Sequence, residues 1–378
     1  MKGTLIQKLP NPFVMENGRT VSVPEDWKIR REEIKKSVLD ICYGGMPPEP
    51  DSTEGFLLCT GVNGMQTYLI TVRAGGNELN FEMKVHLPIS RSELKNIGRY
   101  PVVLDGDGCW AATPTEKVLE NFRSRGIIFA SFNRCTLVRD VDDHKEVLGS
   151  PLYRLFPGIG SGSIAGWAWG FSRCIDVLER FPFVDSRYIA VTGHSRGGKT
   201  ALIAGVTDER PIIVNPNGSG AGGCGCYRYR IGSSDPEERN RTENLADSIR
   251  LVPSWYSTKM KNYVDREAEL PFDQHYLKAL IAPRYFLETN AHGDVWANPP
   301  GSNGTLMAAR EVYRFLGVED RILINCRYGG HAHSTEDYEI LADLMDCVRN
   351  GKAPAESLLR DPYPEMREIF DWESPKYK

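Results

Sequence analysis

The feature that most constrains the fold of this chain is the heptapeptide Gly-His-Ser-Arg-Gly-Gly-Lys at residues 193–199. An apolar run at 188–192 precedes it, and a run of small residues at 200–204 follows it. This order predicts a strand, a sharp turn and a helix. A G-x-S-x-G pattern at such a junction is typical of the nucleophile elbow of α/β-hydrolases, where glycines allow the tight turn. Ser195 is therefore the candidate nucleophile.

Strand and helix patterns alternate along most of the chain, which predicts a mostly parallel sheet covered on both faces. Short apolar runs predict strands at 101–104, 126–132, 187–192, 212–214, 285–287 and 321–326. Helical patterns fall at 115–125, 164–180, 305–315 and 336–349. Three earlier runs, separated by turn residues, predict antiparallel strands at 56–62, 67–72 and 81–87. The expected fold is an α/β-hydrolase, a three-layer sandwich whose N-terminal strands are antiparallel.

The length of 378 residues fits one α/β domain, since such folds often reach this size. Residues 1–54, interrupted by prolines, are predicted to be an N-terminal lead-in segment. Residues 55–378 then form a single catalytic domain. Residues 216–274 are rich in Gly, Arg and polar side chains, and we expect them to form an insertion over the active-site edge of the sheet.

Composition excludes several classes of partner. A net charge of −4 and a pI near 6.1 argue against nucleic-acid binding. No run reaches the ~18 apolar residues of a membrane span, and the N-terminus lacks the apolar core of a secretory signal, so a cytoplasmic protein is expected. The nine cysteines are predicted to be reduced, and the Cys224-Gly-Cys226 spacing does not suit a zinc site. We expect no metal and no cofactor, and the oligomeric state stays open.

A serine nucleophile needs a histidine base and an acid that orients it, in the chain order Ser, acid, His. His331 and His333 both follow the last predicted strand, where the base should lie, and their spacing does not choose between them. Asp294 follows the strand at 285–287, where the acid should lie. The alternative for Asp294 is a turn-capping role.

Arg196 is a candidate for oxyanion stabilisation. Its backbone N–H follows the nucleophile, and its guanidinium would favour negative charge developing on the substrate. The alternative for this side chain is a salt bridge to a neighbouring carboxylate. The loop at 105–110, after a predicted strand, is where a second oxyanion donor is expected.

In combination, these motifs resemble those of the glucuronoyl esterases, carbohydrate esterase family 15. The elbow is similar to that family's G-C/H-S-R-x-G-K motif. Further similar segments are the glycine-rich run at 218–223, the Tyr-Arg pair at 227–228, Glu243-Asn244, the Leu-Pro-Phe-Asp-Gln-His run at 270–275, the Leu-Ile-Ala-Pro-Arg run at 280–284, Trp296, and His331-Ala332-His333. The resemblance covers most of residues 95–350.

The resemblance implies a serine esterase that cleaves esters of 4-O-methyl-glucuronic acid, which link xylan side chains to lignin alcohols. By position, Ser195 matches the family's nucleophile, His333 its catalytic histidine and Arg196 its oxyanion-stabilising arginine. His331 remains the alternative base. The residues that match sugar-binding positions of the family are Lys199, Glu243 and Trp296. The implied substrate is a small-molecule or oligosaccharide ester.

This chain departs from the family pattern in two places. The usual acid is a Glu just before the glycine-rich run, where this chain has Asn217-Gly218, so Asp294 takes the role as in some bacterial members. The cysteines that flank the nucleophile and the histidine in many members are His194 and Ser334 here, so that disulfide is missing. Two alternatives stay open: an esterase for acetylated xylan or other small carboxylic esters, and a non-catalytic carbohydrate-binding relative.

Overall fold

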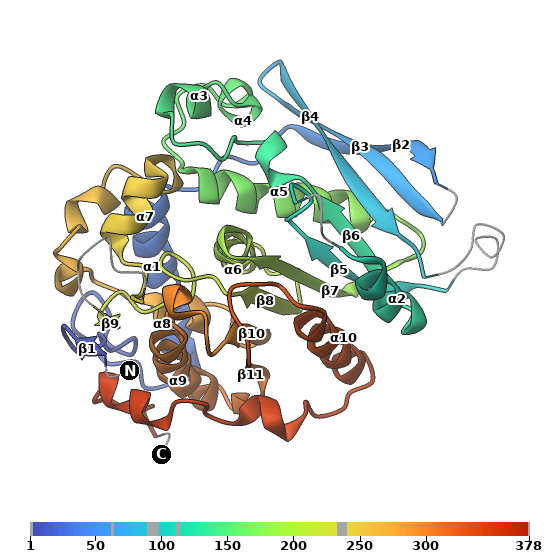
Figure 1. The fold of residues 1–378 in the computed structure, drawn as a ribbon. Coiled ribbons are helices and arrows are strands. Elements are labelled where there is room, and N and C mark those ends of the chain that lie inside the picture. The colour runs from blue at the N-terminus through green and yellow to red at the C-terminus, as the bar shows by residue number, and fades with distance from the viewer. Residues whose placement is uncertain (1–2, 62–63, 89–97, 111–113, 233–239, 377–378) are drawn as a thin grey trace.

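The structure is a computed structural model that describes residues 3–61, 64–88, 98–110, 114–232 and 240–376. Its main feature is a nine-stranded sheet in the order β11-β10-β8-β7-β5-β6-β4-β3-β2 (Figure 1). Neighbouring strands from β11 to β6 run parallel. They are β5 (Tyr100–Asp105), β6 (Ile128–Phe132), β7 (Val184–His194), β8 (Ile213–Asn217), β10 (Tyr285–Ala291) and β11 (Ile322–Arg327). The predicted parallel sheet is confirmed.

The remaining strands of this sheet are antiparallel, also as predicted. They are β2 (Ser52–Thr60), β3 (Met65–Ala74) and β4 (Asn77–His86). β3 and β4 pair in antiparallel register through the turn at Gly75-Gly76, and β4 joins the parallel part along β6. The first predicted run, 56–62, begins four residues earlier in the structure, and its end at Val62 lies outside the described residues.

Helices cover both faces of the sheet, which confirms the three-layer sandwich. Side chains of α5 (Ser163–Leu178), α6 (Arg196–Thr207), α8 (Gln274–Ala279) and α9 (Pro299–Phe315) share one apolar cluster. Those of α2 (Glu116–Ser124) and α10 (Thr335–Arg349) share another. Along β5, Val102 and Leu104 belong to the first cluster and Val103 to the second, because successive side chains of a strand point to opposite faces.

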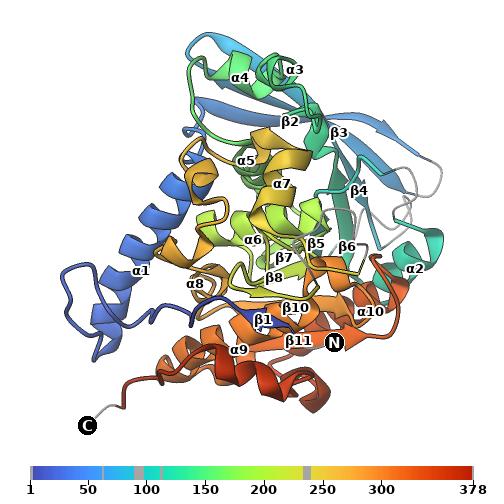
Figure 2. The same cartoon turned by 60° about the vertical axis from the view of Figure 1, so that its left-hand side comes forward.

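The lead-in segment packs onto the domain rather than standing apart from it. Helix α1 (Pro24–Val38) contributes Ile34 and Val38 to the main core (Figure 2). Strand β1 (Thr4–Leu5) pairs with β9 (Tyr229–Arg230), inside the predicted insertion. The other short helices are the π-helical turn Leu39–Tyr43, α3 (His144–Leu148), α4 (Pro151–Leu155), α7 (Leu245–Leu251), and 3₁₀ turns at Arg134–Thr136, Pro253–Trp255, Met260–Tyr263, Glu267–Glu269, Val295–Ala297, Glu319–Arg321, Glu356–Leu359 and Pro364–Ile369. Within the described ranges, no helix has the length and apolar character to cross a membrane.

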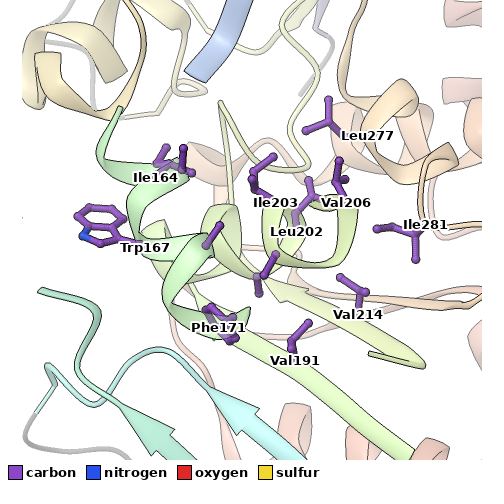
Figure 3. Packing of buried hydrophobic residues seen from close by; sticks show 14 of the residues in the cluster. Ile164, Trp167, Phe171, Val191, Leu202, Ile203, Val206, Val214, Leu277 and Ile281 are labelled. Carbon is purple, nitrogen blue, oxygen red and sulfur yellow. The ribbon is translucent and has the colours of Figure 1, made fainter. Parts of the chain in front are cut away.

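The core beneath Ser195 is densely apolar. Figure 3 shows α5 and α6 side by side, with Phe171 and Leu202 facing Val191 of β7 and Val214 of β8. All four side chains are fully buried. Burying one such side chain contributes roughly 1.5–3 kcal/mol to stability. The elbow between β7 and α6 therefore rests on a rigid base.

Candidate active site

Ser195 occupies the predicted elbow between β7 and α6. Its backbone has φ 56° and ψ −120°, a left-handed conformation that costs a non-glycine residue on the order of 1–3 kcal/mol. The Ser195 N–H donates to the Asn217 carbonyl at 2.9 Å, which ties the turn to β8. A Cβ on Gly193 would lie 2.6 Å from the Gly197 carbonyl oxygen, so the crossing of strand and helix requires glycine there. The strained serine is thus held by its surroundings.

Asp294 and His331 are joined by a hydrogen bond. Nδ1 of His331 lies 2.6 Å from Oδ2 of Asp294, which follows β10. The Asp294 side chain is 5% exposed and that of His331 is 40% exposed. Since a carboxylate accepts the Nδ1 proton, Nε2 of His331 is left free to accept another. This is the arrangement that a general base requires.

Hydrogen bonds from one arginine hold the loop on both sides of His331. Arg327, at the end of β11, donates to the carbonyls of Gly330 at 3.3 Å and of Ala332 at 2.6 Å. Its Nε also donates to the buried carboxylate of Asp337 at 2.9 Å. The buried guanidinium therefore fixes the direction in which His331 leaves the loop.

His333, which the resemblance placed in the role of the base, points elsewhere, and the structure thereby contradicts the predicted contact between Asp294 and His333. Its ring stacks on Tyr338 at 3.8 Å between centroids, and neither ring nitrogen has a hydrogen-bond partner among the described residues. Burial, with His194 and Arg327 nearby, lowers the pKa of His333 well below its usual value. The histidine next to Asp294 is His331, whereas His333 stacks on Tyr338 and lines the same pocket without reaching Asp294.

His194 stands beside His331 at the position of the family's missing cysteine. The two rings lie 4.4 Å apart between centroids, and Nδ1 of His194 donates to Oδ1 of Asn217 at 2.6 Å. Burial first, and the nearby His331 second, lower the pKa of His194. Sequence reasoning did not predict this ring contact, since His194 was interpreted only as an absent cysteine. A neutral ring therefore packs where a disulfide is usual.

The position of the family's usual acid lies next to Asp294. A Cβ on Gly218 would lie 3.4 Å from Oδ2 of Asp294 and 3.4 Å from Cε1 of His194. A carboxylate from the end of β8 would therefore compete for the space that Asp294 occupies. The geometry explains how the acid can come from the loop after β10 in this chain.

Ser195, Arg196 and His331 line one pocket of about 500 Å³. The other lining residues are Asp107, Trp110, Thr115, His194, His333 and Tyr338. Trp110 also borders a second pocket of about 620 Å³, lined in part by β4 and the end of β6. Ser195 and its candidate base thus open into one cavity, and a larger space adjoins it.

Arg196 forms a salt bridge with a neighbouring carboxylate, as the alternative interpretation of this side chain predicted. It also lines the Ser195 pocket. Nη1 of Arg196 lies 3.0 Å from Oδ2 of Asp140, and its guanidinium lies 5.0 Å from the Trp255 ring. The indole N–H of Trp255 also donates to Asp140, at 3.2 Å. Because a guanidinium carries five N–H donors, these contacts orient Arg196 and leave donors for an oxyanion.

Three N–H groups of the predicted second donor loop at 105–110 already have hydrogen-bond acceptors within the protein. Asp107 N–H donates to Asp105, Gly108 N–H to the Phe132 carbonyl, and Trp110 N–H to the Asp107 carbonyl. These three groups are not available to an oxyanion. The loop instead supports the elbow, because the Asp107 carboxylate accepts the N–H of His194 at 2.5 Å.

The three predicted sugar-binding residues do not line the Ser195 pocket as the structure describes it. Nζ of Lys199 bonds Oε2 of Glu243 at 3.0 Å and the carbonyls of Ser219 and Ala221, and both charged side chains are buried. Glu243 N–H donates to the Trp296 carbonyl at 2.9 Å, which anchors the insertion near the carboxyl end of β10. Lys199 and Glu243 therefore hold the glycine-rich segment together.

The sheet, the strained serine at the end of β7 and the acid–histidine pair define an α/β-hydrolase. The family model described as "Glucuronyl esterase, fungi" matches residues 70–317. The chain is 31% identical to the 4-O-methyl-glucuronoyl methylesterase 1 of Phanerochaete chrysosporium, over 86% of this chain and 65% of that protein. It is 30% identical to the enzyme of that type from Schizophyllum commune, over 86% and 77%. The chain belongs to the glucuronoyl esterase family, carbohydrate esterase family 15.

Solved structures agree with this placement. A family 15 glucuronoyl esterase from Caldicellulosiruptor kristjansonii superposes with a TM-score of 0.82 at 31% identity, covering 97% of each chain. The catalytic domain from Hypocrea jecorina gives 0.80 at 26% identity, covering 100% and 99%. A serine-to-alanine variant from Sporotrichum thermophile, in complex with methyl 4-O-methyl-β-D-glucopyranuronate, gives 0.78 at 25% identity, covering 95% and 92%. The chain spans about 65% of the length of the Phanerochaete chrysosporium and Cerrena unicolor relatives.

Proposed function

We propose that this protein is a serine carboxylic-ester hydrolase that cleaves esters of 4-O-methyl-glucuronic acid in xylan- and lignin-derived fragments. The observation that carries this proposal is the 2.6 Å contact between Asp294 and His331 in the loops that surround Ser195. Membership of the glucuronoyl esterase family supports the uronate as the acid half of the ester. The contacts of Lys199 and Glu243 give no independent support for sugar binding by their side chains.

In the proposed mechanism, Nε2 of His331 takes the Ser195 hydroxyl proton while Oγ attacks the ester carbonyl carbon. Asp294 holds Nδ1–H of the ring and stabilises the imidazolium that forms. The Arg196 guanidinium and its backbone N–H, at the N-terminus of α6, receive the oxyanion. His331 then gives its proton to the leaving alcohol, and water hydrolyses the glucuronoyl–Ser195 ester by the same steps.

A substrate panel tests the proposed specificity. We expect methyl and benzyl esters of 4-O-methyl-glucuronic acid to be hydrolysed with a kcat/KM at least about tenfold above that for acetylated xylo-oligosaccharides, a preference of ~1.4 kcal/mol in transition-state binding. The measurement is initial rates by liberated acid. Preferential deacetylation would identify the alternative esterase. Saccharide binding without turnover of any ester would identify a carbohydrate-binding relative.

Substituting Asp294 by Asn tests the acid. We expect kcat to fall by ~10⁴, because an amide does not fix the tautomer or stabilise the imidazolium as a carboxylate does. The matched control is Asp320→Asn, an exposed aspartate in the turn before β11, for which no loss is expected. A kcat for Asp294→Asn within a few-fold of the unsubstituted protein would assign Asp294 the capping role instead.

The expected cytoplasmic location stays a prediction.

A further inference from the structure

The cavity of about 620 Å³, called the adjoining pocket below, meets the Ser195 pocket at one residue. That residue is Trp110, which follows β5, is 46% exposed and lines both cavities. The loop that carries it is fixed to β6 by the hydrogen bond from Gly108 N–H to the Phe132 carbonyl at 3.0 Å. A substrate bound at Ser195 therefore has the adjoining pocket as its neighbouring space on the Trp110 side.

The floor of the adjoining pocket is the outer face of three neighbouring strands, β3, β4 and β6. Leu69 of β3 lies directly opposite Glu82 of β4, and Lys84 of β4 lies opposite Ser131 of β6. Opposite residues of antiparallel strands share a face of the sheet, and all four line the pocket. The apolar cluster beneath α2 and α10 contains no described residue of β3 or β4, so these helices leave that part of the face uncovered.

The adjoining pocket combines apolar surface with two charges. Met65 and Leu69 are partly exposed apolar side chains of β3, and Trp110 adds an indole. Glu82 and Lys84 are exposed, and neither has a hydrogen bond or an ion pair with another described residue. An aromatic ring suits the apolar surface, and oxygens on that ring suit a carboxylate acceptor and an ammonium donor.

The chemistry at Ser195 indicates which half of the ester enters the adjoining pocket. In the proposed mechanism, Nε2 of His331 gives its proton to the leaving alcohol oxygen, which must therefore lie in the Ser195 pocket. Trp110 lines that pocket together with His331, so the rest of the alcohol meets the adjoining pocket at the indole. The uronate suits this space less well, because its ring hydroxyls would face Met65 and Leu69 without hydrogen-bond partners.

We propose that the adjoining pocket binds the alcohol half of the ester and takes aryl alcohols whose ring carries hydroxyl or ether oxygens. This inference rests on the proposed ester hydrolysis and adds the class of leaving alcohol to it. Met65 and Leu69 contact the ring, Glu82 accepts a phenolic O–H, and Lys84 donates to an ether oxygen. None of these residues touches the reacting atoms, so the pocket acts on KM for aryl esters rather than on kcat.

Three esters of 4-O-methyl-glucuronic acid test the pocket: the methyl ester, a phenylpropyl ester, and a phenylpropyl ester with a hydroxyl and a methoxy group on the ring. For the unsubstituted protein, we expect kcat/KM to rise at least about tenfold from the methyl to the phenylpropyl ester, and about threefold more with the ring oxygens. In Leu69→Asn, the first step should shrink to about twofold, through KM. In the double variant Glu82→Leu/Lys84→Met, the second step should disappear while the first remains.

Leu57→Asn is the matched control for Leu69→Asn. Leu57 is a 52% exposed leucine of β2 that pairs with Tyr68, so it points to the opposite face of the sheet from Leu69. It lines neither pocket, and its substitution should leave all three values of kcat/KM within about twofold. Melting temperatures of both variants check the fold.

Two results would overturn the alcohol subsite while leaving ester hydrolysis intact. One is an equal kcat/KM for the methyl and aryl esters in the unsubstituted protein, or an undiminished aryl preference in folded Leu69→Asn. The other is a loss in Leu69→Asn that is confined to a methyl ester whose uronate is linked to a xylo-oligosaccharide, which would assign the pocket to the glycan. No turnover of any ester by the unsubstituted protein would instead contradict the proposed function itself.

Discussion

The Ser195→Ala variant is expected to lose ester hydrolysis, with kcat reduced by ~10⁶, the cost of removing the nucleophile of a serine triad. The loss is large because Oγ forms and breaks the covalent bond, and no other group of the elbow can replace it. Steady-state rates on benzyl 4-O-methyl-glucuronate measure the effect. Substrate binding should survive, so a product or ester analogue should still bind to the variant.

The fold control for this variant is its melting temperature and far-UV circular dichroism. Alanine removes only one oxygen, and the core below the elbow, including Val191 and Leu202, is untouched. We therefore expect the variant to fold like the unsubstituted protein. A well-folded Ser195→Ala protein with most of its activity would show that the chemistry does not use this serine.

Much of the fold follows from local pattern. The alternation of apolar strands and amphipathic helices predicted the parallel sheet, because buried strands and covering helices have different hydrophobic periods. The glycines around Ser195 predicted the elbow, since only they allow strand and helix to approach this closely. Asp294 was also predicted from its place after β10, with His333 as the favoured base and His331 as the alternative.

The choice between His331 and His333 depended on contacts that spacing does not encode. Arg327 binds the carbonyls on both sides of His331, and Tyr338 provides the flat surface on which His333 stacks. Both partners lie outside the histidine motif. Spacing therefore left both histidines open and the resemblance favoured His333, whereas in the folded loop His331 is the one that contacts Asp294.

The sequence also did not predict that the side chains of Lys199 and Glu243 would have their hydrogen-bond partners within the protein. Their charges suit a sugar hydroxyl, but the structure directs them at each other and at carbonyls of the glycine-rich segment. A buried charge costs several kcal/mol unless it is paired, so folding selects the pairing that is closest. Residue type alone predicted polar side chains at these positions, but not the groups to which they bind.

His331→Ala is the second variant with a large expected effect, a loss in kcat of ~10⁶ like that of Ser195→Ala. Without the imidazole, the Ser195 proton has no acceptor and the leaving alcohol has no donor. Asp294 would remain in place, held partly by the 3.4 Å contact from the Ala297 N–H. The loss should therefore reflect the missing base rather than a collapsed loop.

His333→Phe is the matched control for this substitution. Phenylalanine keeps a flat ring against Tyr338 and removes two ring nitrogens that have no hydrogen-bond partner among the described residues. Because burial lowers the pKa of His333 well below its usual value, the ring is neutral in the folded protein at neutral pH. We expect kcat to stay within about tenfold, since volume-conserving swaps in a packed site are tolerated best.

The most direct test of the catalytic assignment is a side-by-side measurement of kcat on benzyl 4-O-methyl-glucuronate for His331→Ala and His333→Phe. The contact between His331 and Asp294 leads us to expect a loss of ~10⁶ for the first variant and less than about tenfold for the second. The opposite order, with both variants folded, would contradict the proposed triad of Ser195, His331 and Asp294.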